Sequence, residues 1–318
     1  MGVYSKIYKD VLISQNVPED VGVLSALAID LFLDYHSDNG ELEKLGRLQC
    51  MTLYDLMIRT NHYLIKGGKL TENQKNRIVN QFLQEVSTTY QRLKDDKGVK
   101  SSNNTDSQGR RMYPEFFIPP YNNGKKYKTI LNQTPKTQIL SANAYELEIL
   151  RLLFLLSPEN EAVTDMVDAT LKRLKTTCFG YADDGVGECF DASLVVLRFL
   201  CTVAPSDTDW IISRMINYKD HVNEKKRPGF SLWYYWLCLS EMPFDLAESE
   251  ILIYKNEMID WLTNKSCVMN SDTDKTIHPV LLSILRNTIS RLPLYEYIKG
   301  REPYIDDKDG RLHFNMQP

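Results

Sequence analysis

Four carboxylates lie within nine residues of one segment and are interspersed with glycines. They are Asp183, Asp184, Glu188 and Asp191. Crowded carboxylates raise one another's pKa unless a cation or hydrogen-bond donors compensate, and glycines let the backbone approach a ligand closely. The pattern predicts a catalytic general acid/base pair, or a site for a divalent metal ion with a polyphosphate. The structural alternative is that these acids stabilise the dipole of the helix that follows.

An aromatic stretch, FSLWYYW at 230–236, opens another predicted helix. Trp233 and Trp236 are three residues apart and share one helix face. Such rings can stack on sugars or stabilise a carbocation, although ordinary core packing is the alternative. We predict that part of this stretch lines a substrate cavity. The predicted binding residues are Tyr181, Trp233, Tyr234, Trp236 and Glu241, with Tyr113 and Phe117 from a separate aromatic segment.

Two residues are candidate metal ligands. Cys189 and His278 each stand at the start of a predicted helix, and thiolate, imidazole and carboxylate groups are all zinc ligands. A capping or solvated histidine is the alternative for His278. The sequence therefore leaves the cofactor unidentified and is compatible with a divalent metal.

Helical periodicity dominates the chain, and strand alternation is scarce. Prolines end several apolar helices, because proline has no N–H and disfavours helical geometry in the residue before it. The predicted helices are 3–14, 19–37, 41–66, 72–95, 143–157, 160–176, 189–204, 207–219, 230–242, 246–264 and 277–292.

An arginine recurs at the same place in three of these helices. Arg151, Arg198 and Arg286 each follow two aliphatic residues and stand seven positions before a proline. The prolines at 158, 205, 243 and 293 are 47, 38 and 50 residues apart, a spacing typical of stacked helical hairpins. The first helix of a unit is apolar nearly all round and the second is amphipathic, which places the first inside and the second outside. We predict an all-α fold of about five or six hairpins closing into an (α/α) toroid, with an open α-solenoid as the alternative.

One long segment interrupts this pattern. Residues 96–141 begin polar and rich in serine and asparagine and then become aromatic, with Tyr113, Phe116 and Phe117. Loops of this length in a compact domain are uncommon and often serve as lids. We therefore predict a single helical domain over 1–318 with an inserted loop at 96–141 that is partly lid-like.

Composition excludes several classes of function. The chain has 38 Lys and Arg against 42 Asp and Glu, a net charge of −4, which argues against a broad nucleic-acid surface. No apolar run reaches about 18 residues, so a membrane span is not expected. The start of the chain lacks the apolar core of a signal peptide, which predicts a cytoplasmic location. The oligomeric state is left open.

The stretch GYADDGVGECFDASLVVLRFL, with the hairpin repeat around it, resembles the α/α-toroid superfamily of terpenoid cyclases and protein prenyltransferase β subunits over roughly residues 140–293. In prenyltransferases an Asp-x-Cys and a later His hold zinc. Cys189 and His278 fall at similar places, with Gly187 at the position of the aspartate. Six-hairpin glycosidases and uronyl hydrolases carry paired acids at the same face, which also fits Asp183, Asp184, Glu188 and Glu241.

Three functions are therefore predicted in order of preference. The first is an enzyme with an acidic and aromatic central cavity that acts on an apolar, isoprenoid-like substrate. The second is a carbohydrate-active toroid that uses paired carboxylates. The third is a non-catalytic helical scaffold that binds a protein or peptide.

Overall fold

The computed structural model describes residues 23–24, 51–95, 115–119, 126–135, 138–181, 188–225 and 230–318. These residues are predominantly helical, as the periodicity predicts. The α-helices are α4 (Leu53–Ile65), α5 (Glu72–Asp95), α6 (Gln138–Leu156), α7 (Glu161–Leu174), α8 (Glu188–Val203), α9 (Thr208–Lys225), α10 (Phe230–Glu241), α11 (Phe244–Thr263) and α12 (Asp272–Ile289). A 3-10 helix, η3 (Pro293–Ile298), follows α12.

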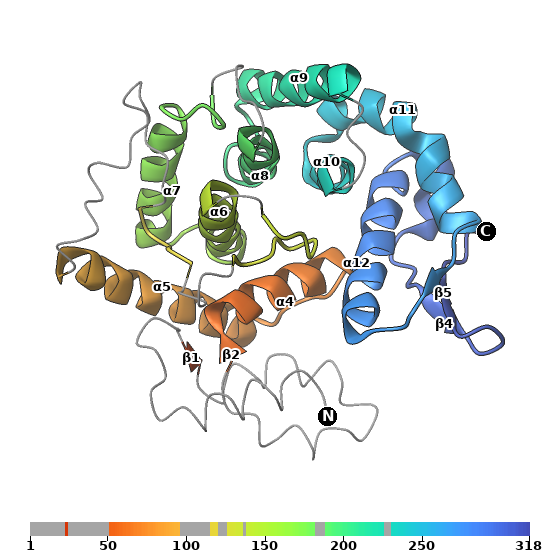
Figure 1. Cartoon of the computed structure of the whole chain (residues 1–318), viewed down its shortest axis with the longest axis horizontal. Helices are drawn as coiled ribbons and strands as arrows, with labels where there is room; N and C mark the ends of the chain where they lie inside the picture. The colour runs from red at the N-terminus through yellow and green to blue at the C-terminus, as the bar shows by residue number, and fades with distance from the viewer. Residues whose placement is uncertain are drawn as a thin grey trace, which may run out of the picture.

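The even-numbered helices form an inner layer. Helix α4 contacts α6, α6 contacts α8, α8 contacts α10, α10 contacts α12, and α12 contacts α4 again. Figure 1 shows α6, α8 and α10 grouped in the interior and viewed nearly along their axes. Residues 192–201 of α8 and 234–239 of α10 are buried without interruption, because each helix has neighbours on all sides. This is the environment that an all-round apolar helix requires.

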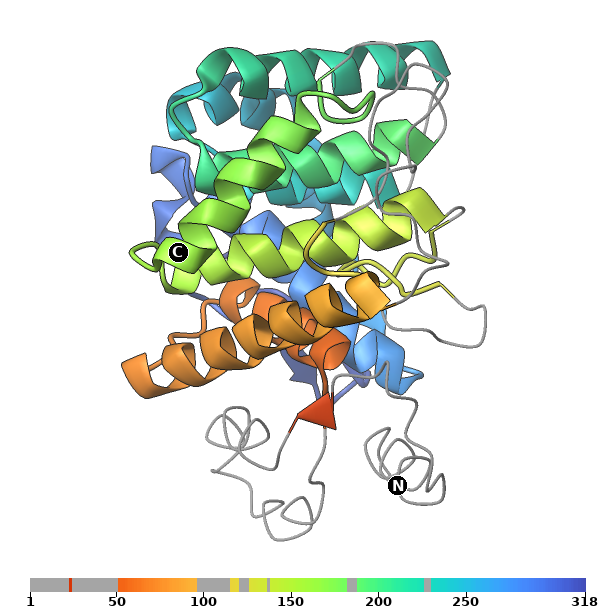
Figure 2. The ribbon, with the colours of Figure 1, turned by 90° about the vertical axis from the view of Figure 1, so that its left-hand side faces the viewer.

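The odd-numbered helices form an outer layer. Helix α5 lies against α4 and α6, α7 against α6, α9 against α8, and α11 against α10 and α12. Figure 2 shows α9 at the edge of the molecule beyond α8. Helix α7 is amphipathic and turns Val163, Met166 and Val167 inward, with Asn160 capping its first turn through the amide of Val163 at 3.3 Å.

Side chains of α12 form hydrogen bonds with the C-terminal end of α4. Arg286 of α12 donates to the carbonyl oxygens of Ile65 and Lys66, at 3.3 and 3.0 Å, and Asn287 donates to Ile65 at 2.7 Å. The final carbonyls of a helix have no partner within the helix, so these bonds satisfy the C-terminal end of α4. The chain then turns away through Gly67, whose φ of +99° favours glycine.

Short strands appear in two segments that were predicted to be helical, and also in the C-terminal part, where no strand was predicted. Strand β1 (Val23–Leu24) lies inside the predicted helix 19–37, and β2 (Met51–Thr52) lies inside the predicted helix 41–66; the two pair antiparallel. The C-terminal part forms a sheet in the order β3-β5-β4, from Cys267–Val268, Arg311–His313 and Tyr304–Asp306. Strands of two or three residues are too short to show an alternating sequence pattern. They form because they pair with a segment that is distant in the sequence.

Helix α4 begins at Leu53 instead of 41, and two other helices begin five residues earlier than predicted. Helix α12 begins at Asp272 instead of 277, because Ser271 and Asp274 form a capping box. Helix α6 begins at Gln138 instead of 143, which shortens the inserted segment. Among the described residues, no helix is both long enough and apolar enough to span a bilayer.

Candidate functional site

The arginines of the sequence repeat are all buried in the inner layer. Arg151, Arg198 and Arg286 are 5%, 1% and 1% exposed. Arg286 binds the end of α4, as described above, and the other two enter a cluster of polar groups at the meeting of α4, α6, α8 and α10. We call this the central cluster: Asn61, Glu148, Arg151, Arg198, Tyr234 and Glu241.

Arg198 is the hub of the central cluster. Its Nε and Nη2 bind the two oxygens of Glu241, both at 2.8 Å, in the bidentate geometry that guanidinium favours. Its Nη1 binds Glu148 at 2.7 Å and the Asn61 oxygen at 3.0 Å. Arg151 adds a second cation, with Nη2 at 2.8 Å from Glu241. Two arginines thus face two glutamates, and the buried charge balances.

The pairing sets the charge of these groups. Burial alone would lower the pKa of Arg198, but Glu148 and Glu241 outweigh it and raise that pKa well above its usual value. Burial would raise the pKa of Glu241, but Arg151 and Arg198 lower it. Burial and then Glu148 raise the pKa of Tyr234, so its hydroxyl keeps its proton and donates to Glu148. At neutral pH the cluster therefore combines a charged Arg198 and a charged Glu241 with the protonated hydroxyl of Tyr234.

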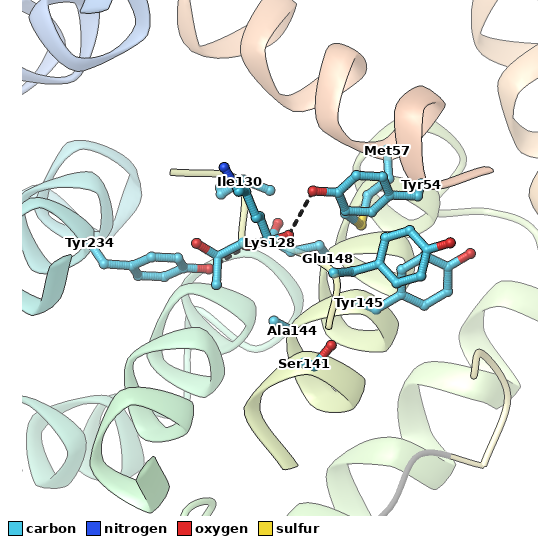
Figure 3. Close-up of a pocket in the computed structure, with 11 residues that line it drawn as sticks. Tyr54, Met57, Lys128, Ile130, Ser141, Ala144, Tyr145, Glu148 and Tyr234 are labelled. Atoms are coloured by element: carbon cyan, nitrogen blue, oxygen red, sulfur yellow. Dashed lines mark hydrogen bonds between the residues drawn. The ribbon is translucent and has the colours of Figure 1, made fainter. Parts of the chain in front are cut away.

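A small pocket adjoins the central cluster and shares Glu148 and Tyr234 with it. Its free interior is about 10 Å³, room for about one water molecule. It lies between α4, α6, α10 and the segment 126–135 (Figure 3). Its lining residues are Tyr54, Met57, Tyr127, Lys128, Thr129, Ile130, Ser141, Ala144, Tyr145, Glu148 and Tyr234.

Tyrosine rings form one wall of the pocket. The centroids of Tyr54 and Tyr127 are 4.5 Å apart, and those of Tyr127 and Tyr145 are 6.4 Å apart. The segment 126–135 is held over the pocket from α4, because Tyr54 donates to the carbonyl of Lys128 at 2.9 Å and His62 Nε2 lies 2.6 Å from the carbonyl of Ile130. Burial lowers the pKa of His62 to about 4, so it contacts this carbonyl as a neutral ring.

One hydroxyl on the pocket floor lacks a hydrogen-bond partner within the described part of the chain. Ser141 is 3% exposed, and its Oγ finds no hydrogen-bond partner among the described residues. Figure 3 shows this side chain on α6 below Tyr145, with its oxygen directed toward the space beneath the tyrosine rings. Buried hydroxyls are nearly always paired, so this position is suited to a polar atom of a bound molecule.

Part of the aromatic segment is anchored to α6 near this site. The backbone amides of Glu115 and Phe116 both donate to Glu146, at 2.8 and 2.9 Å, and Phe117 is fully buried. Glu146 also pairs with Arg173. Phe117, predicted to line the cavity, thus packs in the core, whereas Tyr113 lies outside the described residues.

The acidic segment is described only at its two ends. Asp183 and Asp184 lie outside the described residues, and Glu188 is described only as the first residue of α8. Asp191 is half-buried in the first turn of α8. Tyr181 is 57% exposed and packs edge-on against Trp210, while its carbonyl accepts from Arg214 at 2.8 Å.

The aromatic side chains of α10 lie in different surroundings. Trp236 is fully buried and packs edge-on against Trp233, with centroids 5.0 Å apart. Trp233 is half-buried and also contacts Trp261. Tyr234 alone reaches the pocket, while Glu241, at the end of the same helix, joins the central cluster.

The two candidate metal ligands do not form a metal site among the described residues, where no group of three or more His, Cys, Asp or Glu side chains converges. Cys189 has its sulfur 3.4 Å from that of Cys178. His278 lies in the first turns of α12, with Nε2 3.8 Å from Asp274. Any ligation of a metal by Cys189 with the acids of 182–187 falls outside the described residues.

Sequence reasoning did not single out the central cluster or the pocket as a site. The arginine repeat was a usable signal, because a charged residue recurring in apolar helices demands a buried partner. Glu148, three residues before Arg151 in α6, could have been recognised from the sequence as a candidate partner for one of these arginines.

Comparisons with protein-family models, curated proteins and solved structures find no match.

Proposed function

We propose that this chain is an (α/α) toroid of about five hairpins that binds a small, hydroxyl-rich ligand of the sugar class in the tyrosine-walled pocket. The cycle of contacts from α4 through α12 and back to α4 supports the toroid. The inner layer built from the first helix of each unit supports it further. An open solenoid would leave α4 and α12 apart.

The hydroxyl of Ser141, which has no hydrogen-bond partner in the part of the chain that the structure describes, carries the proposal about the ligand. It shares the pocket with the carboxylate of Glu148, the hydroxyl of Tyr234 and the rings of Tyr54 and Tyr127. A ligand hydroxyl can donate to a carboxylate and accept from a serine, and tyrosine rings pack on the apolar face of a sugar. The pocket is narrow, so a ligand enters by displacing the segment 126–135, which is bonded to α4 through two side chains.

The geometry supports binding better than cleavage of a glycosidic bond. Such cleavage needs a carboxylic acid that keeps its proton near neutral pH. Arg151 and Arg198 lower the pKa of Glu241, and Glu148 uses its two oxygens to accept from Arg198 and Tyr234. Glu148 therefore acts as an acceptor that orients a ligand hydroxyl, and Arg198 acts as the group that positions Glu148.

An isoprenoid-like ligand is the second candidate. It is favoured by the start of α8, where the exposed ring of Tyr181 and the half-buried Asp191 flank the acidic segment 182–187. That ligand would depend on the acids of 183–188 and not on Ser141. The two candidates are therefore separable by mutation.

The experiment is a thermal-shift and calorimetry screen of mono- and oligosaccharides against prenyl diphosphates with magnesium. We expect a sugar to raise Tm and a prenyl diphosphate to leave it unchanged. Ser141→Ala should raise the Tm of the ligand-free protein slightly, because it removes a buried unpaired hydroxyl, and weaken sugar binding about fivefold. Ser283→Ala is the matched control, since that buried hydroxyl is paired with the carbonyl of Pro279 at 2.7 Å. It should lower Tm and leave binding unchanged.

Two results would contradict the proposal. One is the absence of sugar binding at millimolar concentration. The other is a Ser141→Ala variant that loses as much stability as Ser283→Ala while binding sugar normally. A shift with prenyl diphosphates that is lost in Asp184→Ala would favour the isoprenoid candidate, and no shift with either class would favour a scaffold.

A further inference from the structure

Two cysteines that are eleven residues apart in the sequence meet at the junction of α7 and α8. The sulfurs of Cys178 and Cys189 are 3.4 Å apart, and both are thiols in this structure. A disulfide requires about 2.05 Å between sulfurs, so a small movement of one side chain brings them to bonding distance. We propose that Cys178 and Cys189 are a modification site: a reversible thiol–disulfide couple.

The surroundings of Cys178 hold it in place. Helix α7 ends at Leu174, and the turn that follows is fixed by three bonds: Gly180 donates to Thr177 Oγ1 at 3.1 Å, Trp210 donates to Gly180 at 2.7 Å, and Arg214 donates to Tyr181 at 2.8 Å. Cys178 is 7% exposed. A thiol fixed at contact distance from another reacts as an intramolecular partner with a high effective concentration.

The two sulfurs differ in their access to solvent. Cys189, in the first turn of α8, is half-buried, whereas Cys178 is buried. An oxidant such as glutathione disulfide therefore meets Cys189 first. The Cys189 thiolate attacks one glutathione sulfur, forms a mixed disulfide and releases one glutathione. The Cys178 thiolate then attacks the Cys189 sulfur and releases the second glutathione. In total, two protein thiols become one disulfide, one glutathione disulfide becomes two glutathiones, and the two thiol protons pass to the glutathione thiolates.

The bond would join the two ends of the segment 178–189, whose sequence contains Asp183, Asp184 and Glu188. A cross-link over about a dozen residues restricts the unfolded chain and stabilises the folded one. It would also fix the start of α8 against the turn after α7. The redox state of the two cysteines would thus affect the acidic segment for which the sequence predicts catalytic or metal-binding chemistry. The inference does not depend on the sugar pocket, which lies between α4, α6 and α10.

The experiment treats the full-length protein with mixtures of oxidised and reduced glutathione. Peptide mapping without reduction should recover a Cys178–Cys189 linkage, alkylatable thiols should fall by two per chain, and dithiothreitol should restore them. The oxidised protein should melt about 5 °C higher than the reduced one. Cys189→Ser should remove the linkage and the Tm difference, whereas Cys267→Ser, a change at another half-buried cysteine, should leave both intact.

Three outcomes would overturn the proposal. These are two unreacted thiols in wild-type protein under oxidising mixtures, a stable glutathione adduct on Cys189 that Cys178 does not resolve, and stoichiometric zinc retention by this pair that blocks oxidation. The mapping uses wild-type protein, so it decides the matter even if a serine variant fails to fold.

Discussion

Replacing Arg198 with methionine tests whether the centre of the molecule is an ionic cluster that the fold depends on. The substitution keeps a long apolar side chain and removes the guanidinium, which makes four hydrogen bonds to Glu148, Glu241 and Asn61. Glu241 keeps Arg151 as a partner, and Glu148 keeps only the hydroxyl of Tyr234 among the residues that the structure describes. Removing one member of a buried ion pair typically costs 3–5 kcal/mol, and we expect a loss of about 4 kcal/mol in the free energy of unfolding.

Urea unfolding followed by tryptophan fluorescence measures this loss, and the second substitution Glu148→Gln tests its cause. The double variant should recover about 1–2 kcal/mol relative to Arg198→Met, because it removes the uncompensated charge. The matched control is Lys75→Met. Lys75 lies 2.6 Å from Glu72, but that glutamate side chain is 81% exposed, and an exposed pair contributes only about 0.5 kcal/mol.

The loss in Arg198→Met should also depend on pH. Arg151 and Arg198 lower the pKa of Glu241 in the folded wild type below its usual value. The unfolded wild type therefore binds more protons as pH falls from about 5 toward 3, so this contribution to stability is lost there, and the variant, which lacks Arg198, has less of it to lose. The gap to wild type should narrow over that range. The ionic account would be refuted if Arg198→Met lost less than about 1 kcal/mol in the free energy of unfolding. It would also be refuted if the loss changed neither with pH nor on adding Glu148→Gln.

Three further predictions follow from individual contacts. Because burial lowers the pKa of His62 from 6.5 to about 4, stability should fall as pH drops from 6.5 toward 4, by up to about 3 kcal/mol, and His62→Gln should flatten this part of a Tm-against-pH profile. Glu146→Gln should free the amides of 115 and 116 from a charged acceptor and speed limited proteolysis near Phe117, while Glu159→Gln, a surface change, should not. Arg286→Met should lower stability by about 3 kcal/mol and speed amide hydrogen exchange in the last turn of α4 before it does so in α8.

The helices were predictable because their signals are local. Capping by Asn160, proline at the ends of helices, and apolar periodicity all act within a few residues. The strands were not, because β1 and β2 are two residues each and are stabilised by each other across a gap of more than 25 residues. The capping box of Ser271 and Asp274 is also a local signal, and the predicted start at 277 missed it.

The candidate site was less predictable for a similar reason. The repeat placed Arg151 and Arg198 in buried helices, but Asn61, which bonds to both, lies 90 and 137 residues away in the sequence. The pocket depends on two side-chain bonds from α4 to the segment 126–135, which span 74 and 68 residues. Residue types alone drew attention to the indole rings of α10, whereas packing assigned Trp236 to the core and Tyr234 to the pocket.

The polar centre also explains how nearly apolar helices adopt one orientation. A helix that is apolar on every side gains similar burial at any rotation about its axis, so the hydrophobic effect alone does not choose a face. Arg198 removes this freedom for α8, since any rotation away from Glu148, Glu241 and Asn61 leaves a buried charge unpaired. Each partner belongs to a different neighbour, α10, α6 or α4, so a single side chain sets the rotation of α8 against all three. We infer that the cluster contributes specificity of packing more than net stability, because apolar side chains of the same volume could fill the space at no greater free energy.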